Sequence, residues 1–407
     1  MPRHLHRWVG ILSLAAAQGL SALSLVQAAE NVRLIDVPDY SWYAGCFGTA
    51  SGNLAGYWDR HGFPNLYTGP TADGVAPLTS NGGNVGIRSL WATKAGFDGR
   101  SADEPGHIDD YWRFYLSDGV NSYESTAPDA YWAAGRDEHE PDCICDFIGA
   151  SQNKWQNLND ECDGNIDAYA VTYWDRTGAR RMNYVPPPQG ALAVRDLPSG
   201  LRAWTRFRGY DCNVFSQLAD FNPNIPSGGG FTFADLKREI DSGYPMMLFL
   251  QNFHELSRPI ANMARANPSV HGMVAFGYFV TDDGQKFVRY RTSWGGSGDN
   301  RMRAWNSDPW EADLPVRGVI AYHPLPRITG ITRANGAISI RWDGPNSKLL
   351  NVTTGAIAAV HRYLVEKSDS LSPGNFLAAS EPTADLEATI PNCCEGTTFF
   401  RVRLLGP

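Results

Sequence analysis

The residue of this sequence best placed to act as a nucleophile is Cys46, within the run Gly45-Cys46-Phe47-Gly48-Thr49-Ala50. From position 47 to position 57 the larger apolar residues recur at helical spacing. A helix that begins at Cys46 presents unpaired N–H groups and the positive end of its dipole to the sulfur, which favours a thiolate. The sequence therefore predicts an activated thiol here, with a buried structural cysteine or half of a disulfide as the alternative.

Three glycines on the same segment predict that this helix is buried. Gly48, Gly52 and Gly56 lie four residues apart, so they share one helical face. Each glycine costs about 1 kcal/mol relative to alanine in a helix interior, and the close approach of another backbone would offset that cost. We therefore expect a central helix that packs tightly within the fold.

A cysteine nucleophile needs a base that is close in the fold, and His271 is the best candidate among nine histidines. It opens the apolar run 272–278, so we expect it at the mouth of a buried strand, facing a cleft. Taken alone, a buried structural histidine is the alternative. Surface or structural roles are expected for His61, His107, His139, His254, His323 and His361.

Together with the downstream run Arg291-Thr292-Ser293-Trp294-Gly295-Gly296, Cys46 and His271 resemble the papain-like cysteine peptidases. That superfamily places cysteine on a central helix, histidine on a strand, and Asn or Asp on the next strand before a Ser-Trp-Gly-type turn. The helix start is similar to the Gly-Cys-x-x-Thr-Ala of bacterial double-glycine (bacteriocin-leader) peptidases, often preceded by a segment like Val37-Pro38. The resemblance covers residues 36–58 and 230–305.

The resemblance implies an α+β protein in which a central N-terminal helix packs on an antiparallel sheet. The peptidase-like domain would span 31–323, with a large insertion at about 60–225. It implies hydrolysis of peptide bonds in a peptide or protein substrate, with Cys46 as thiolate, His271 as base and no cofactor. A transglutaminase or an amide hydrolase would use the same pair.

Two positions depart from the family pattern. Thr292 stands where the family has Asn or Asp, and the alternation of the strand predicts that its hydroxyl contacts His271. The segment 38–44, where the family has a Gln shortly before the cysteine, contains none, so Tyr40 or Ser41 is expected to donate to the oxyanion. Losing one such donor costs ~10²–10³ in turnover. A weak or inactive papain-like fold, used as a secreted binding or adhesion module, is therefore the alternative function.

The N-terminal segment predicts an exported protein. A basic start, an apolar run over 9–25 and the small residues around Ala28 form a signal peptide over 1–28, cleaved near Ala28 for a secreted or periplasmic product. No later segment has 18 uninterrupted apolar residues, so no membrane span is expected. The formal net charge of −8 becomes about −10 without Arg3 and Arg7, which argues against nucleic acid as a partner. The oligomeric state is left open.

Seven cysteines in an exported chain predict disulfides and one free thiol, Cys46. The other six can pair in fifteen ways, and crowding of the first three favours a bridge in the middle of the chain. These six are Cys143, Cys145, Cys162, Cys212, Cys393 and Cys394. Zinc is the competing interpretation, but no Cys-x-x-Cys pair or suitably spaced histidine supports it.

The segment 159–167 is rich in oxygen ligands around a glycine, as a calcium loop requires. It lacks the late bidentate Glu of the helix-loop-helix pattern, so a solvated turn tied down by Cys162 is favoured and no metal is predicted. The calcium candidates are Asp160, Asp163, Asn165 and Asp167.

The remaining patterns predict the elements around these residues. Thr232 and Asp235 form a capping box for a helix that ends at Gly243, followed by strands at 246–251, 272–280 and 287–293. A further helix is expected at about 84–95. After Pro326 the composition shifts to short strands, at 337–342, 363–367 and 399–405. This segment, 325–407, predicts a small all-β sandwich and resembles a fibronectin type III-like domain, with a plain β-domain as the alternative.

Overall fold

The computed structural model describes residues 30–41, 46–67, 75–79, 144–148, 182–183, 197–221, 225, 227–251, 270–311, 313–393 and 396–406. The fold is mixed α+β, with few helices and mostly antiparallel sheets. Its described helices are α1 (Cys46–Arg60), α5 (Ile144–Ile148), α6 (Leu197–Phe207), α7 (Phe233–Asp241) and the 3₁₀ turn η7 (Pro373–Asn375). None of these is long and apolar enough to cross a membrane.

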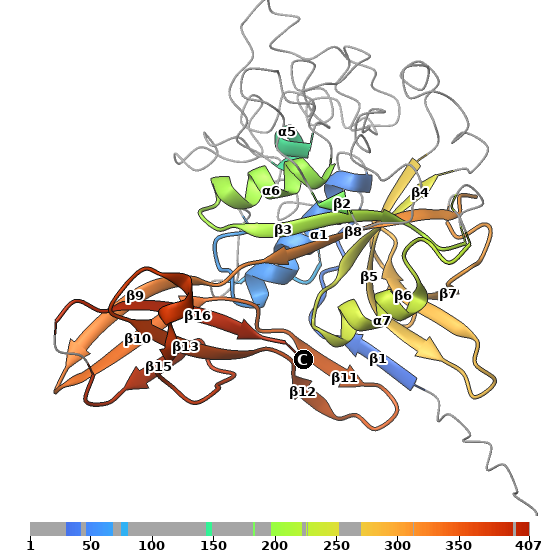
Figure 1. The fold of residues 1–407 in the computed structure, drawn as a ribbon. Coiled ribbons are helices and arrows are strands. Elements are labelled where there is room, and N and C mark those ends of the chain that lie inside the picture. The colour runs from blue at the N-terminus through green and yellow to red at the C-terminus, as the bar shows by residue number, and fades with distance from the viewer. Residues whose placement is uncertain are drawn as a thin grey trace, which may run out of the picture.

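The described strands run antiparallel in one large sheet and two small ones (Figure 1). They are β1 (Glu30–Leu34), β2 (Met182–Asn183), β3 (Cys212–Leu218), β4 (Met246–Gln251), β5 (Val270–Val280), β6 (Lys286–Arg291), β7 (Met302–Ala304), β8 (Val316–Pro324), β9 (Arg327–Ala334), β10 (Ala337–Asp343), β11 (Lys348–Asn351), β12 (Ile357–Ala359), β13 (Arg362–Ser368), β14 (Leu377–Ala378), β15 (Glu387–Ile390) and β16 (Phe399–Leu405).

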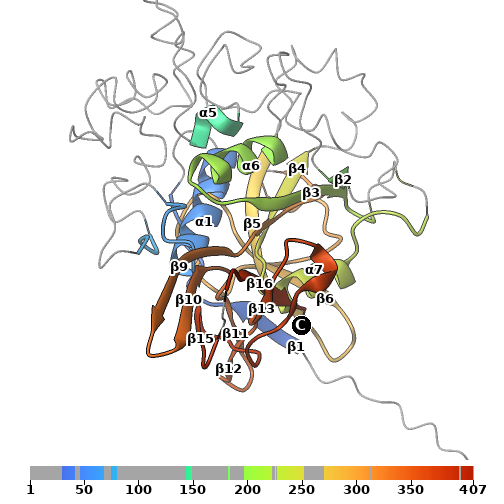
Figure 2. The same ribbon diagram turned by 60° about the vertical axis from the view of Figure 1, so that its left-hand side comes forward.

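Helix α1 is the buried central helix that the glycine stripe predicts. It begins at Cys46, and every residue from Phe47 to Asp59 is buried. It packs along β5, as Figures 1 and 2 show. At Gly56, however, the close neighbours are the side chains of Tyr40 and Pro38 rather than another backbone.

The large sheet has the order β12-β11-β1-β5-β4-β8-β3-β2, and β6 pairs with β5 and β7 outside this path. Strand β4 is buried throughout and β5 almost throughout, because both are continuous apolar runs. The strands expected at 246–251, 272–280 and 287–293 correspond to β4, β5 and β6. The capping box of α7 is also present, with Thr232 and Asp235 bonded reciprocally.

Part of the segment expected as an insertion belongs to the sheet. Strand β3 pairs with β8 over seven residues, from Cys212 opposite Pro324 to Leu218 opposite Gly318. Helix α6 packs next to β3. Strand β3, near the end of the segment 60–225, is therefore part of the large sheet. The helix expected at 84–95 lies outside the described residues.

The C-terminal segment forms a sandwich of two three-stranded sheets, β15-β10-β9 and β14-β13-β16. Its core contains Ile340, Trp342, Tyr363 and Val365. The hairpin β11–β12 leaves this sandwich, and β11 pairs with β1 of the large sheet. The C-terminal lobe is thus joined to the large sheet by strand pairing (Figures 1 and 2), and the boundary expected at 325 does not separate all of its strands from that sheet.

Candidate active site

His271 lies at the start of β5, where it is 2% exposed, and one ring nitrogen has a defined partner. Its Nε2 lies 2.8 Å from the backbone oxygen of Thr292. A carbonyl oxygen can only accept a hydrogen bond, so Nε2 carries the proton. In the neutral ring Nδ1 is then the basic nitrogen, which is the tautomer that a general base for Cys46 needs.

The predicted contact between the Thr292 hydroxyl and His271 is wrong; the backbone carbonyl makes the contact instead. The hydroxyl lies 2.9 Å from Ser297 Oγ and accepts from the Trp294 N–H at 3.2 Å. The chain leaves β6 at Arg291 and turns at Ser293, whose φ is 64°. This turn presents the Thr292 oxygen to the imidazole, so no amide or carboxylate side chain is needed to orient the imidazole.

The indole of Trp294 covers the imidazole. The two rings are stacked, with centroids 5.0 Å apart and planes at 12°. Trp294 is 40% exposed, so it shields the buried His271 from solvent. Ser293 Oγ donates to the Gly272 oxygen at 2.8 Å, which fastens this turn to β5 directly after the histidine.

The thiol of Cys46 lies against the backbone on both sides of His271. Its Sγ is 4.0 Å from the Val270 oxygen, and it receives a hydrogen bond from the backbone of Gly272. Among the described residues no hydrogen bond joins Sγ to the imidazole. Catalytic hydrogen bonds of this kind often form only when substrate binds.

Burial shifts both members of the pair toward their neutral forms. Burial raises the pKa of Cys46 to about 11, although backbone hydrogen bonds from Gly272, Phe47 and Cys46 act in the opposite direction. Burial lowers the pKa of His271 to about 4, against the smaller effects of the Thr292 carbonyl and the Glu311 charge. Desolvation therefore outweighs the helix start, and the thiolate expected from the sequence is not the resting state.

The close approach of α1 to β5 depends on Gly272. A Cβ atom built on Gly272 would lie 2.5 Å from Cδ1 of Phe47, the residue after Cys46. No side chain fits at that distance without displacing the phenyl ring or the helix start. The glycine that follows His271 thus allows the thiol to reach the strand.

Of the two residues expected at the oxyanion, only Ser41 lies near the Ser-Trp-Gly turn. Its Cα would be 2.8 Å from a Cβ built on Gly295. The Tyr40 hydroxyl instead donates to the Pro77 oxygen at 2.8 Å and lies next to Gly56. Gly56 is about 15 Å along the helix axis from Cys46 at 1.5 Å per residue, so Tyr40 is a core side chain of the helix's far half.

Cys46 and Cys212 are free thiols, so the described part of the chain has one more free cysteine than expected. Burial raises the pKa of Cys212 to about 12. No group of three metal-ligating residues occurs among the described residues. The calcium candidates Asp160, Asp163, Asn165 and Asp167 lie outside them, and the pairing of the remaining cysteines stays a prediction.

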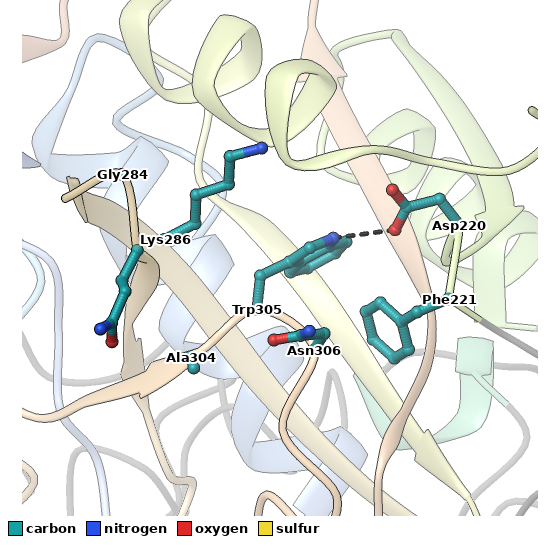
Figure 3. A pocket seen from close by; sticks show the side chains of 8 residues that line it. Asp220, Phe221, Gly284, Lys286, Ala304, Trp305 and Asn306 are labelled. Atoms are coloured by element: carbon teal, nitrogen blue, oxygen red, sulfur yellow. Dashed lines mark hydrogen bonds between the residues drawn. The ribbon is translucent and has the colours of Figure 1, made fainter. Parts of the chain in front are cut away.

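A separate pocket of about 540 Å³ lies where β7 ends beside the segment that follows β3. Its aromatic wall is held by a hydrogen bond from Trp305 Nε1 to Asp220 Oδ1 at 2.9 Å (Figure 3). The lining residues are Asp220, Phe221, Gly284, Gln285, Lys286, Ala304, Trp305 and Asn306. Its described lining contains neither cysteine nor histidine, so these residues offer no thiol chemistry.

Sequence reasoning missed two contributors to this region, the Thr292 carbonyl and Ser297. Ser297 Oγ accepts from the Thr292 N–H at 3.0 Å and thereby holds the backbone of the residue whose carbonyl oxygen meets His271. The Gly-Gly-Ser-Gly run after Trp294 was the available signal for a tight loop at this place.

No protein-family model, curated protein or solved structure matches this chain.

Proposed function

We propose that this chain is an exported thiol hydrolase of papain-like fold that cleaves peptide bonds with Cys46 as nucleophile and His271 as base. The observation that carries the proposal is the hydrogen bond from His271 Nε2 to the Thr292 oxygen. This bond leaves Nδ1 as the basic nitrogen of the ring. The backbone groups that contact Cys46 Sγ belong to Val270 and Gly272, the two neighbours of His271 in the chain. The signal peptide predicted at 1–28 supports export.

Because the pair is neutral at rest, the proton moves as the sulfur attacks. Nδ1 of His271 takes the proton from Sγ while Sγ forms a bond to the substrate carbonyl carbon. The N–H groups at the start of α1 and Ser41 hold the oxyanion. Nδ1 then gives its proton to the leaving nitrogen as the C–N bond breaks, and water hydrolyses the thioester to regenerate the thiol. Throughout, Nε2–H stays on the Thr292 oxygen, which holds the imidazolium that forms.

The test uses Cys212 as a control, since it is a second free thiol, although a more deeply buried one. The secreted protein is incubated with a broad peptide library, and the products are identified by mass spectrometry. Cys46→Ala should abolish cleavage, whereas Cys212→Ala should leave it intact. Cleavage that survives Cys46→Ala would rule the proposal out.

The second candidate function is a papain-like fold used for binding or adhesion without catalysis. The raised pKa of Cys46 favours this non-catalytic function, because a thiol with a pKa of about 11 is unreactive at neutral pH. Iodoacetamide labelling separates the two. A hydrolase should show labelling of Cys46 whose pH profile changes in His271→Gln, while an inert module should show labelling only above about pH 8.5 and no dependence on His271.

A further inference from the structure

We propose that Arg291 is the positioning residue of this site, because one buried guanidinium ties together the loop that orients His271 and the segment that leads to Cys46. The inference rests on the proposed function for its kinetic consequences. Its structural part, the orientation of the imidazole, does not.

The loop after β6 has a backbone that needs support from outside. Ser293, Gly295, Gly296 and Gly298 all have φ between 63° and 76°. This left-handed region costs a non-glycine residue about 1–2 kcal/mol, and glycine loses more conformational freedom than other residues when it is ordered. Since the Thr292 oxygen must stay within hydrogen-bonding distance of His271, something must hold this loop in one conformation.

Arg291 closes the loop from its first residue to its last. Its Nη1 donates to the Gly298 oxygen at 2.6 Å, and its Nη2 donates to Asp299 Oδ1 at 2.9 Å. The N–H of Gly298 donates to Asp39 Oδ2 at 3.1 Å, and that oxygen lies 3.9 Å from Arg291 Nη1. Both polar groups of the Gly298 backbone are therefore held by a charged side chain.

The same guanidinium reaches the chain that leads to Cys46. Nη2 donates to the Val37 oxygen at 2.7 Å, so Arg291 and Asp39 join residues 37–39 to the loop. On its other side, the guanidinium lies 4.4 Å from the ring centre of Phe276, on the strand that carries His271. One side chain thus contacts the lead-in to the nucleophile, the strand of the base and the loop that orients the base.

The chemistry of the contact requires arginine. The side chain is 6% exposed, and hydrogen bonds from a charged donor are strongest when they are shielded from water. A planar fork can serve Gly298, Asp299 and Val37 at once, whereas the single ammonium of lysine cannot match these directions. Lysine at this position would keep the charge and lose the geometry.

Arg289 offers a matched control on the same strand. It is also buried, at 2% exposure, and it donates to the Asp299 oxygen and to Asn31 Oδ1, each at 2.7 Å. These contacts reach the far end of the loop and β1. They touch neither Gly298 nor residues 37–39, so Arg289 supplies comparable burial and charge without the link between nucleophile and base.

The experiment compares Arg291→Lys with Arg289→Lys in the full secreted chain. Both variants should lower the midpoint of urea unfolding. Only Arg291→Lys should lower kcat, on the order of 10²-fold, with KM little changed, as expected when a catalytic group is misplaced by about 1 Å. Only Arg291→Lys should convert His271, seen by ¹⁵N NMR of histidine-labelled protein and assigned with His271→Gln, from the Nε2–H tautomer to a mixture.

Equal effects of the two variants on kcat and tautomer, or an unchanged tautomer in Arg291→Lys, would overturn the inference. If Arg291→Lys does not fold, Asp39→Asn tests the same link, because it keeps the arginine and removes the charged acceptor of the Gly298 N–H. If the wild-type protein cleaves nothing, the proposed function fails, but the NMR comparison still decides the role of Arg291.

Discussion

The described part of the chain holds histidines in two regions, and only one of them has the features expected of an active site. The first surrounds His271 on β5. The second lies where the end of α1 and strand β8 meet the connections to the C-terminal lobe, and it contains three residues that we call the junction histidines: His61, His323 and His361.

In both regions there are histidines whose pKa values are lowered by burial: His271 in the first, and His61 and His361 in the second. Burial lowers the pKa of His271 to about 4 and that of His361 to about 3, and the charges of His61 and His323 lower the latter further. Burial also lowers the pKa of His61. A strongly shifted histidine is therefore not, by itself, a mark of the catalytic region in this protein.

The two regions differ in the groups that surround their imidazole rings. His271 has an acceptor that fixes its tautomer, a thiol against the adjacent backbone and a half-exposed indole as its cover. His361 Nε2 has no hydrogen-bond partner among the described residues and lies 2.6 Å from where a Cβ of Gly243 would be. The comparison teaches that a fixed tautomer and a neighbouring thiol, rather than burial, distinguish the candidate site around His271 from the junction.

The largest expected effect comes from replacing one histidine of each region with glutamine. His271→Gln should reduce kcat/KM by about 10²–10⁴-fold, since it removes the general base. His361→Gln should leave kcat/KM of the folded protein unchanged, because that ring contacts no group of the site. Steady-state hydrolysis of a peptide found by the library screen measures both. Similar losses in both variants would mean that the two regions are coupled, and the distinction would fail.

The next effect concerns the glycine that packs in each region. Gly272→Ala places a Cβ 2.5 Å from Phe47, and Gly243→Ala places one 2.6 Å from His361 Nε2 in a backbone with φ of 86°. Each should cost about 1–3 kcal/mol of unfolding free energy through overpacking, and Gly243→Ala about 1–2 kcal/mol more through strain.

Turnover separates the two glycine variants. Gly272→Ala should also slow hydrolysis, because it moves the start of α1 away from β5, whereas Gly243→Ala should spare it. Urea unfolding gives the free energies, and turnover is normalised to the folded fraction. Loss of turnover in Gly243→Ala alone would contradict the assignment of the site.

Local patterns predicted the elements that carry the site. Apolar spacing and the run at 45–50 predicted that α1 starts at Cys46, and continuous apolar runs predicted β4 and β5. The capping box of α7 and the strands of the C-terminal sandwich followed from equally local signals. In each case, residues within a few positions of one another decide the structure.

The features that the sequence did not predict depend on distant contacts. The Thr292 oxygen meets His271 because of a turn at Ser293, which side-chain alternation along a strand cannot foresee. Packing of α1 on β5 raises the pKa of the thiol through desolvation, although the helix start alone favours a thiolate. Similarly, nothing in the short strand β11 indicates that it pairs with β1 rather than within the sandwich.

The smallest expected effect is an acid-dependent loss of stability that originates at the junction. The pKa of His361 is lowered from 6.5 to about 3. Between these two pH values, His361 is protonated in the unfolded chain and neutral in the folded protein. The contribution of His361 to stability is therefore complete above pH 6.5 and declines as the pH falls toward 3. The slope should be up to about 1.4 kcal/mol for each pH unit. Urea unfolding between about pH 7.5 and pH 4.5 measures it.

His361→Gln should reduce this slope by the contribution of a single bound proton. His61, His323, Tyr244 and Ser347 face the ring. The nearby carboxylate of Glu239 is hydrogen-bonded to His323 at 2.5 Å, so it does not stabilise a charge on His361 directly.

His271→Gln should flatten the slope as well, but only between about pH 6.5 and pH 4, because the pKa of His271 is less strongly lowered. If the slope in His361→Gln equals that of the wild type, His361 takes up its proton in the folded state. The ring would then be solvated in the folded protein, and the assignment of His361 as a buried structural histidine would be wrong.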